Sequence, residues 1–338
     1  MTAGAPEVRA FASVRFRRER ENGWLELEAL VEQVREHGTG SLEPDQLERF
    51  PLLYRSALSS LSVARAIALD RALIDYLDNL TLRAFLAFYA PPLDVAAAAQ
   101  HFFVRGLPQA VRALRWHVLI ALAALAIGIL TGFVLVNGNE QQWFGALVPA
   151  DLAGGRGPAS SAADLMANEI AAPVPDNVFG AIANGFFSNN TLVALLIFGT
   201  GMLAGVPTIL LTAYNGTVLG AMFALHYHRG LTVEFAGWVG IHGVTELLAV
   251  VLMAAAGLRL GEILIFPTES SRADAFAIHG PAAAKVAVGG VAMLAVAAVL
   301  EGYFRPAVQS TDARLAVAVA GLLAWAAYFT FAGRNASE

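Results

Sequence analysis

The sequence lacks cysteine entirely, and only 14% of its 338 residues are charged. The absence of cysteine excludes disulfide bonds, zinc sites with thiolate ligands, iron–sulfur clusters and cysteine nucleophiles. Lysine occurs once, at Lys285, and the residues before it do not form the glycine-rich pattern of a P-loop. ATP hydrolysis at such a loop is therefore excluded. The sequence also has no HExxH zinc-protease motif and no motif that indicates a cofactor.

A surplus of basic residues is missing as well, because the net charge is −5. No overall positive field would attract nucleic acid, so we expect no nucleic-acid partner. The charges are unevenly distributed along the chain. Residues 1–115 hold 14 of the 22 basic residues and 14 of the 27 acidic ones. This third is polar enough to fold in water, and the apolar excess lies in the remainder.

The remainder of the chain consists of long apolar runs. Hydrophobic residues make up 57% of the sequence, and the mean hydropathy is +0.58. Crossing a bilayer takes about 20 apolar residues. Six segments approach this length, at about 116–136, 191–213, 216–227, 235–257, 286–304 and 315–331. We predict an all-α, polytopic helical membrane bundle of about six spans, in which 216–227 is short for a full crossing.

The first third predicts a separate helical domain at residues 1–92. Amphipathic spacing indicates three main helices there, at 24–36, 51–68 and 71–89, with a further short helix before Pro51. Charged residues on these helices fit either a solvated surface or a face that docks a partner. Residues 93–115 predict an amphipathic helix that leads into the transmembrane domain at 116–334.

The distribution of arginine predicts the orientation in the membrane. Arg105, Arg112 and Arg115 precede the first span, whereas residues 137–189 contain one basic residue and five acidic ones. Basic residues favour the cytoplasmic side, so we expect a cytoplasmic N-terminal domain and an external loop at about 137–189. The first 20 residues carry arginines where a signal peptide would be apolar, which agrees with a cytoplasmic N-terminal domain. With six spans, both termini are expected in the cytoplasm. We expect the membrane to be a bacterial inner membrane.

Three ionisable residues lie within the predicted spans, where each costs at least about 2.5–3.5 kcal/mol. His242 and Glu246 share one helical face, and Glu301 ends the fifth segment. The His242–Glu246 pair fits a self-satisfied structural pair, a pathway for protons, ions or a polar substrate, or part of a metal site. A metal would need a third ligand, for which Glu301, His226 and His228 are candidates. We expect Glu301 to converge on the face that carries His242, and His226 and His228 to lie at the membrane surface.

Asparagines occur where apolar runs begin. Asn189 and Asn190 precede one run, and Asn215 lies at a predicted turn before another. Each fits a helix cap, because a side-chain oxygen there accepts an orphan amide hydrogen. Alternatively, these side chains line a cavity between discontinuous helices.

Glycines within the spans have the spacing of seams at which helix backbones approach closely. The principal candidates are Gly216, Gly220 and Gly243. Such seams serve within one chain or between copies, so a homo-oligomer is one of the expected partners. Pro207 lies inside the second predicted span, where a proline would kink the helix.

Several segments together resemble a known family. They are WLELEALVEQV, LYRSALSSLSVAR, YLDNLTLRAFLAFY, NNTLVALLIFGTGMLAG, YNGTVLGAMFAL, HGVTELLAVVLMAAAGLRLG and LEGYFRP. In these motifs the chain is similar to the stage II sporulation protein M family of integral membrane proteins, over about residues 10–306. The polar elements of the resemblance fall on Asn189-Asn190, Asn215-Gly216, His242-Gly243 with Glu246, and Glu301.

The resemblance implies a membrane anchor that works within a complex. The founding member acts in engulfment during endospore formation. The long arginine-rich N-terminal domain is instead typical of a branch in bacteria that do not sporulate. That branch is often encoded beside a MoxR-type AAA ATPase and an RDD-type membrane protein, which are the partners that the resemblance implies.

These observations lead to three hypotheses of function. The leading one is a non-enzymatic inner-membrane scaffold whose cytoplasmic helices organise a membrane complex, since no complete catalytic motif is present. The alternative is a transporter or channel subunit with a cavity lined by His242, Glu246, Asn215 and Glu301. The third and weakest is an intramembrane metal-dependent hydrolase with His242, Glu246 and Glu301 as ligands. A hydrated cavity around these side chains would favour transport, and a closed dry pair would favour the scaffold.

Overall fold

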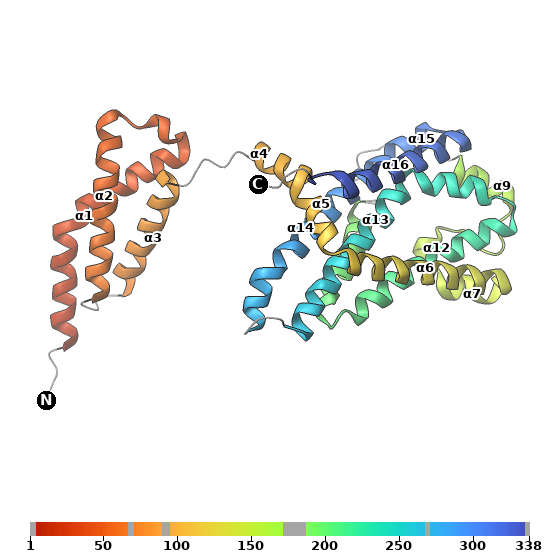
Figure 1. Cartoon of the computed structure of the whole chain (residues 1–338), viewed down its shortest axis with the longest axis horizontal. Helices are drawn as coiled ribbons and strands as arrows, with labels where there is room; N and C mark the ends of the chain where they lie inside the picture. Colours follow the sequence, from red (N-terminus) through yellow and green to blue (C-terminus); the bar gives the residue numbers. More distant parts are fainter. Residues whose placement is uncertain (1–4, 67–70, 90–94, 172–186, 268–270, 335–338) are drawn as a thin grey trace. The chain divides into compact units, whose positions relative to one another are not determined.

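The structure is a computed structural model that describes residues 5–66, 71–89, 95–171, 187–267 and 271–334 (Figure 1). The described residues form helices and contain no strand, which confirms the predicted all-α fold. The chain divides into two compact units, Met1–Asp94 and Val95–Glu338, close to the boundary expected at residue 92.

The described part of the N-terminal unit contains three main helices, α1 (Ala5–His37), α2 (Pro44–Ala66) and α3 (Arg71–Tyr89). Helix α1 ends where predicted, because Gly38 takes a left-handed φ of 78° that stops the helix. The prediction of a separate short helix before Pro51 is wrong, since α2 continues through this proline. Phe50 is fully buried beside Pro51, and this packing outweighs the lost backbone hydrogen bond.

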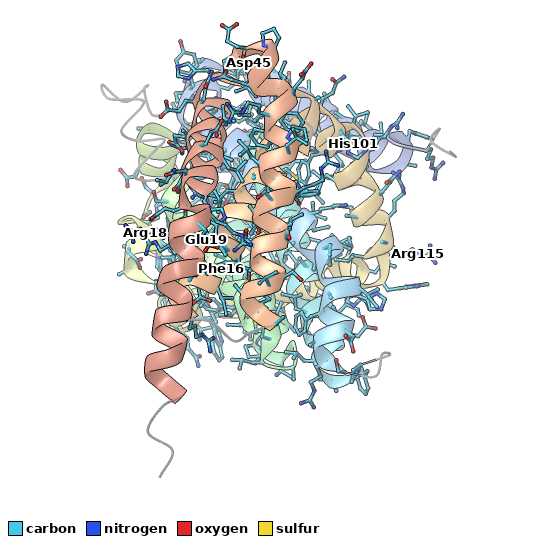
Figure 2. All side chains as sticks on the ribbon, turned by 90° about the vertical axis from the view of Figure 1, so that its left-hand side faces the viewer. Phe16, Arg18, Glu19, Asp45, His101 and Arg115 are labelled. Carbon is cyan, nitrogen blue, oxygen red and sulfur yellow. The ribbon has the colours of Figure 1, made fainter. Side chains whose placement is uncertain are left out.

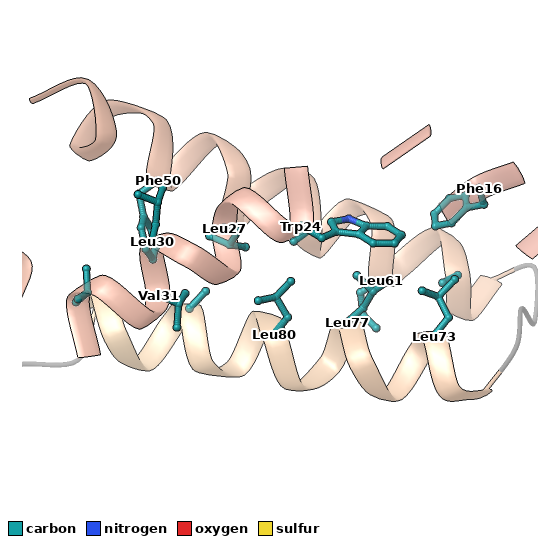
Figure 3. Close-up of a cluster of buried hydrophobic side chains, with 14 of the residues drawn as sticks. Phe16, Trp24, Leu27, Leu30, Val31, Phe50, Leu61, Leu73, Leu77 and Leu80 are labelled. Atoms are coloured by element: carbon teal, nitrogen blue, oxygen red, sulfur yellow. The ribbon is translucent and has the colours of Figure 1, made fainter. Parts of the chain in front are cut away.

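A single hydrophobic core holds the three helices together (Figure 3). Its labelled side chains come from all three helices: Phe16, Trp24, Leu27, Leu30 and Val31 of α1, Phe50 and Leu61 of α2, and Leu73, Leu77 and Leu80 of α3. Each buried apolar side chain of this size contributes roughly 1.5–3 kcal/mol. Charged residues such as Arg18 and Glu19 lie on the outer surface of α1 (Figure 2).

Among the described residues of the second unit, five helices are long and apolar enough to cross a membrane. They are α6 (Arg115–Gly138), α12 (Val206–His228), α13 (Thr232–Ile265), α14 (Arg272–Val299) with its continuation, and α16 (Thr311–Phe331). The continuation of α14 is a π-helical turn, η6 (Leu300–Phe304), followed by the short α15 (Arg305–Ala307). The unit is therefore an integral membrane bundle, as the composition predicts.

The boundary predicted between the second and third spans is wrong. A 12-residue helix, α11 (Ser188–Gly199), and the short turn η5 (Thr200–Met202) come first. The chain then breaks at Ala204 and Gly205, which both have positive φ. Helix α12 begins directly afterwards and runs without interruption through the predicted turn at residues 215–216. Pro207 lies in the first turn of α12, where its missing N–H costs nothing, so it starts a helix and does not kink one.

Glycines bring α6 and α12 into backbone contact. A Cβ at Gly216 would lie 2.3 Å from the carbonyl oxygen of Leu125, and one at Gly220 would lie 2.0 Å from that of Ile129. The contacts advance in the same direction along both helices, so α6 and α12 run parallel (Figure 1). The chain between them must therefore return along the bundle, and α11 forms the last part of this return.

The two ends of the transmembrane unit meet at one end of the bundle. Arg112 Nη1 donates to the carbonyl oxygens of Phe329, at 2.9 Å, and Ala332, at 2.8 Å. The hydroxyl of Tyr328 donates to the carbonyl oxygen of Phe103 at 2.5 Å. The start of the unit and the end of α16 therefore lie at the same end of the bundle.

The amphipathic helix expected at 93–115 consists of three pieces. They are α4 (Val95–His101), the π-helical η2 (Phe102–Gly106) and α5 (Leu107–Ala113). Leu107 of α5 is buried, and it packs where a Cβ on Gly289 of α14 would clash. The last part of the segment thus belongs to the bundle and does not lie on its surface.

At the opposite end, the segment after α6 folds into short helices over the bundle. They are α7 (Glu140–Leu147), α8 (Ala150–Ala153), α9 (Ala162–Leu165) and the π-helical η3 (Met166–Ile170). Arg229 anchors the segment through an ion pair with Glu140 and a hydrogen bond of 2.8 Å to the carbonyl oxygen of Pro158. Most of the rest of the loop, at 172–186, lies outside the described residues.

Candidate polar site in the transmembrane unit

A cavity of about 520 Å³ lies within the transmembrane unit. Its walls come from α11, α12, α13 and η6, with α8 and the residues after it at one side. The six polar residues predicted from the sequence all line it: Asn189, Asn190, Asn215, His242, Glu246 and Glu301. Residues far apart in the chain therefore converge on one space.

The ionisable residues form a cluster in the cavity wall. His242 and Glu246 lie one turn apart on α13, so the helix presents both to the same side. Glu301 comes from η6, and its Oε1 lies 3.9 Å from His242 Nε2. One ligand atom from each of the three residues lies within 4.8 Å of the other two. The expected approach of Glu301 to His242 is thus confirmed.

Two residues that the sequence analysis missed complete the cluster. Arg305, one turn after Glu301, donates to Glu301 Oε1 at 3.1 Å. Its guanidinium carbon also lies 4.6 Å from the ring centroid of Trp238, a cation–π contact. Trp238 in turn meets the His242 ring edge-on at 5.9 Å. The spacing of Glu301 and Arg305, four residues apart on a helix, was the available signal.

The cluster does not close into a self-satisfied pair. His242 is 94% buried, yet its Nδ1 has no hydrogen-bond partner. Among the described residues, none donates a hydrogen bond to the Glu246 carboxylate. Glu301, by contrast, is paired with Arg305. Buried polar groups normally have partners, so the unpaired groups indicate a site that receives something else.

The asparagines line the cavity and do not cap helices. Asn189 and Asn190 lie in the first turn of α11, and the residue that caps this helix, Phe187, makes no side-chain hydrogen bond. Asn215 lies in the middle of α12, where its Nδ2 donates to the carbonyl oxygen of Leu211 at 2.9 Å. The capping hypothesis is therefore wrong for Asn215, because no helix begins there.

The three predicted packing glycines have two different environments. Gly216 and Gly220 form the contact between α6 and α12, as predicted. Gly243 lines the cavity instead, and the close neighbour of a Cβ there would be Val239 of the same helix, at 2.8 Å. Gly243 is therefore not part of a seam between helices, and its missing side chain leaves space beside His242.

The other candidate metal ligands lie elsewhere. The surface position expected for His226 is wrong, because its ring is fully buried, stacks on Phe235 at 3.9 Å and contacts the Met222 carbonyl oxygen at 2.8 Å. His228 lies 3.1 Å from Glu140. Glu301 is therefore the residue that joins His242 and Glu246.

The family model for stage II sporulation protein M matches residues 118–306, which is more than half of the chain. The chain belongs to the stage II sporulation protein M family. A second family model, a domain of unknown function (DUF8413), matches residues 14–90. Comparison with curated proteins finds no match, and comparison with solved structures finds none either.

The stage II sporulation protein M match contains all the residues that line the cavity. It begins within α6 and ends within α15, so it includes the His242–Glu246–Glu301 cluster, the asparagines and Arg305. The second match falls on the three helices of the N-terminal unit. The two structural units thus correspond to two separate sequence families.

Proposed function

We propose that the transmembrane unit binds a small polar or ionic ligand in the cavity and works as a transporter or channel subunit. The convergence of six polar side chains from four elements on one cavity carries this proposal. Polar groups in a bilayer are costly, and they commonly mark ion and substrate pathways.

We place the protein in a bacterial inner membrane, with the N-terminal unit and the C-terminus in the cytoplasm. Arg105, Arg112, Arg115, Arg259 and Arg272 all lie at the end of the bundle where the unit begins and ends. The positive-inside rule favours the cytoplasm for that end. Six passages of the chain agree with this arrangement, with α11 as part of the second. The cavity wall that includes Leu152 and Arg156 then faces outward.

The scaffold role is a second candidate, supported by a different observation. Helix α3 buries one face in the core but leaves an apolar stripe of Leu82, Phe85 and Leu86 about half exposed. These positions are neighbours on the helix surface, as in helices that dock a partner. By family resemblance, we propose a MoxR-type AAA ATPase as the protein that binds this stripe. An RDD-type membrane protein or a second copy of the chain would contact the bundle.

Complementation of a deletion strain separates the two roles. We would express wild type, His242→Ala, Glu246→Gln and a chain without residues 1–90, and measure growth under envelope stress and membrane levels. His117→Ala and Glu262→Gln serve as controls, because this second histidine–glutamate pair lies outside the cavity lining. If the cavity variants fail at normal abundance while the controls work, the cavity carries the function. If only the truncation fails, the cavity proposal is wrong and the scaffold role replaces it.

A further inference from the structure

The cavity cluster has the composition and spacing of a metal site. One imidazole and two carboxylates, from His242, Glu246 and Glu301, place ligand atoms within 4.8 Å of one another. In a tetrahedral zinc site with bonds of about 2.0–2.1 Å, neighbouring ligand atoms lie roughly 3.3–3.4 Å apart. His242 Nε2 and Glu301 Oε1 are already at 3.9 Å. Small rotations of the two glutamate side chains would bring the ligand atoms to the separation that a zinc site requires.

An independent observation indicates that the histidine lacks its natural partner. His242 is 94% buried in the cavity wall, and its Nδ1 has no hydrogen-bond partner. No hydrogen bond from the described residues holds this ring, and a metal bound to one of its nitrogens would fix its orientation. A structural imidazole–carboxylate pair would instead show a hydrogen bond shorter than the 3.9 Å between His242 and Glu301.

The local charges also favour a cation. Glu246 and Glu301 together bring two carboxylates, and Arg305 is the single arginine in contact with Glu301 among the described residues. The Glu246 carboxylate has no cationic partner among the described residues, so in this buried site it is costly unless a cation binds or the group takes up a proton. Arg305 donates to Glu301 Oε1, the same oxygen that lies 3.9 Å from His242 Nε2, and so orients this carboxylate toward His242.

We propose that His242, Glu246 and Glu301 bind one divalent transition-metal ion of the zinc class. An imidazole ligand selects this class over calcium and magnesium. Three protein ligands leave a fourth position, which opens to the cavity that Asn215 also lines. The inference rests on the proposed function of the cavity, and it names the ion that would hold an anionic or polar ligand there.

Metal analysis of the purified full-length protein tests the inference. After equilibration with zinc and removal of the excess, wild type should retain about one ion per chain at this three-ligand site. His242→Ala and Glu246→Gln should retain at least tenfold less. His117→Ala and Glu262→Gln should retain the wild-type amount, because that pair offers only two ligands. Gel filtration in detergent establishes that each variant is folded.

X-ray absorption on zinc-loaded wild type gives a second readout that needs no variant. The inference predicts a first shell of nitrogen and oxygen only, with at least one imidazole. Absence of bound zinc, or retention that the His242 and Glu246 substitutions do not change, would overturn it. If those variants also fail complementation, the cavity function stands without a metal. If they complement, the cavity proposal fails independently.

Discussion

His242 on α13 and Glu301 on η6 face each other across 3.9 Å, although a full helix separates them in the chain. Glu301 lies in the π-helical turn at Leu300–Phe304, where the register of the helix shifts. Such turns occur often at functional sites. The same turn directs Arg305 toward Glu301 and Trp238.

Arg305 should stabilise the bundle through Glu301. The side chains of both residues are largely buried, so Arg305→Gln leaves a carboxylate without its partner, which costs roughly 3–5 kcal/mol. The double variant Arg305→Gln with Glu301→Gln should recover much of this loss. Thermal unfolding in detergent measures the cycle. Equal melting temperatures for the Arg305 single variant and the double variant would show that the two residues are not coupled.

The α6–α12 contact should tolerate no side chain. In Gly220→Ala the Cβ would lie 2.0 Å from the carbonyl oxygen of Ile129, so the helices must separate. Overpacking of this kind costs about 1–3 kcal/mol. Gly321→Ala is the matched control in α16, where a Cβ meets nothing within 4 Å. The control should be neutral or stabilising by up to about 1 kcal/mol. Similar melting temperatures for both variants would contradict the parallel contact.

Tyr76 should make the folding stability of the N-terminal unit fall at alkaline pH. Burial raises the pKa of Tyr76 from 10.0 to about 12, and the charge of Glu28, which accepts the hydroxyl hydrogen at 3.2 Å, adds to this. The pKa of Tyr76 is higher in the folded state than in the unfolded chain. The contribution of Tyr76 to folding stability is therefore complete below pH 10 and is lost as the pH rises through about 12. The difference in ultraviolet titration between wild type and Tyr76→Phe isolates this group.

The same titration tests whether Glu28 contributes to the raised pKa of Tyr76. In Glu28→Gln the midpoint of Tyr76 should fall, because the neighbouring negative charge is gone. A midpoint near 10.0 in wild type would mean that the hydroxyl is solvated and that the packing of Tyr76 against α1 is wrong.

The exposed stripe on α3 should matter for partners and not for folding. Leu82→Lys and Leu86→Lys place charges on positions that are already more than half exposed, so helix content should not change. Co-purification of the MoxR-type ATPase should fall at least tenfold. Leu52→Lys, equally exposed on α2, is the control. If only the control, Leu52→Lys, reduces co-purification of the ATPase, the docking face lies on α2 and not on α3.

Much of the fold could be predicted because periodicity and hydropathy act locally. The helix at Arg71–Tyr89 and the end of α1 before Gly38 were predicted correctly, since an apolar stripe and a left-handed glycine leave a direct pattern in the sequence. The start of α12 was not, because Asn215-Gly216 has the composition of a turn. Close packing of Gly216 against α6 keeps the helix continuous there, and this tertiary effect has no local signal.

The site was predictable to a similar extent. The free-energy cost of placing an ionisable group in a bilayer was enough to identify His242, Glu246 and Glu301, because such groups are rare in apolar spans. Arg305 and Trp238 were missed since they lie at the end of a span, where such residues are common. The environment of His226 depends on Phe235 from the next helix, which spacing does not reveal.

The absence of cysteine permits a direct test of the central claim, that the polar cavity is hydrated and open to the outside. Single cysteines at Asn215 or Leu219 would line the cavity, whereas one at Ala256 would be fully buried outside its lining. A membrane-impermeant thiol reagent added to whole cells should label Asn215→Cys and Leu219→Cys and leave Ala256→Cys unlabelled. If the cavity positions are as unreactive as Ala256→Cys, the site is dry and closed, and the account is contradicted.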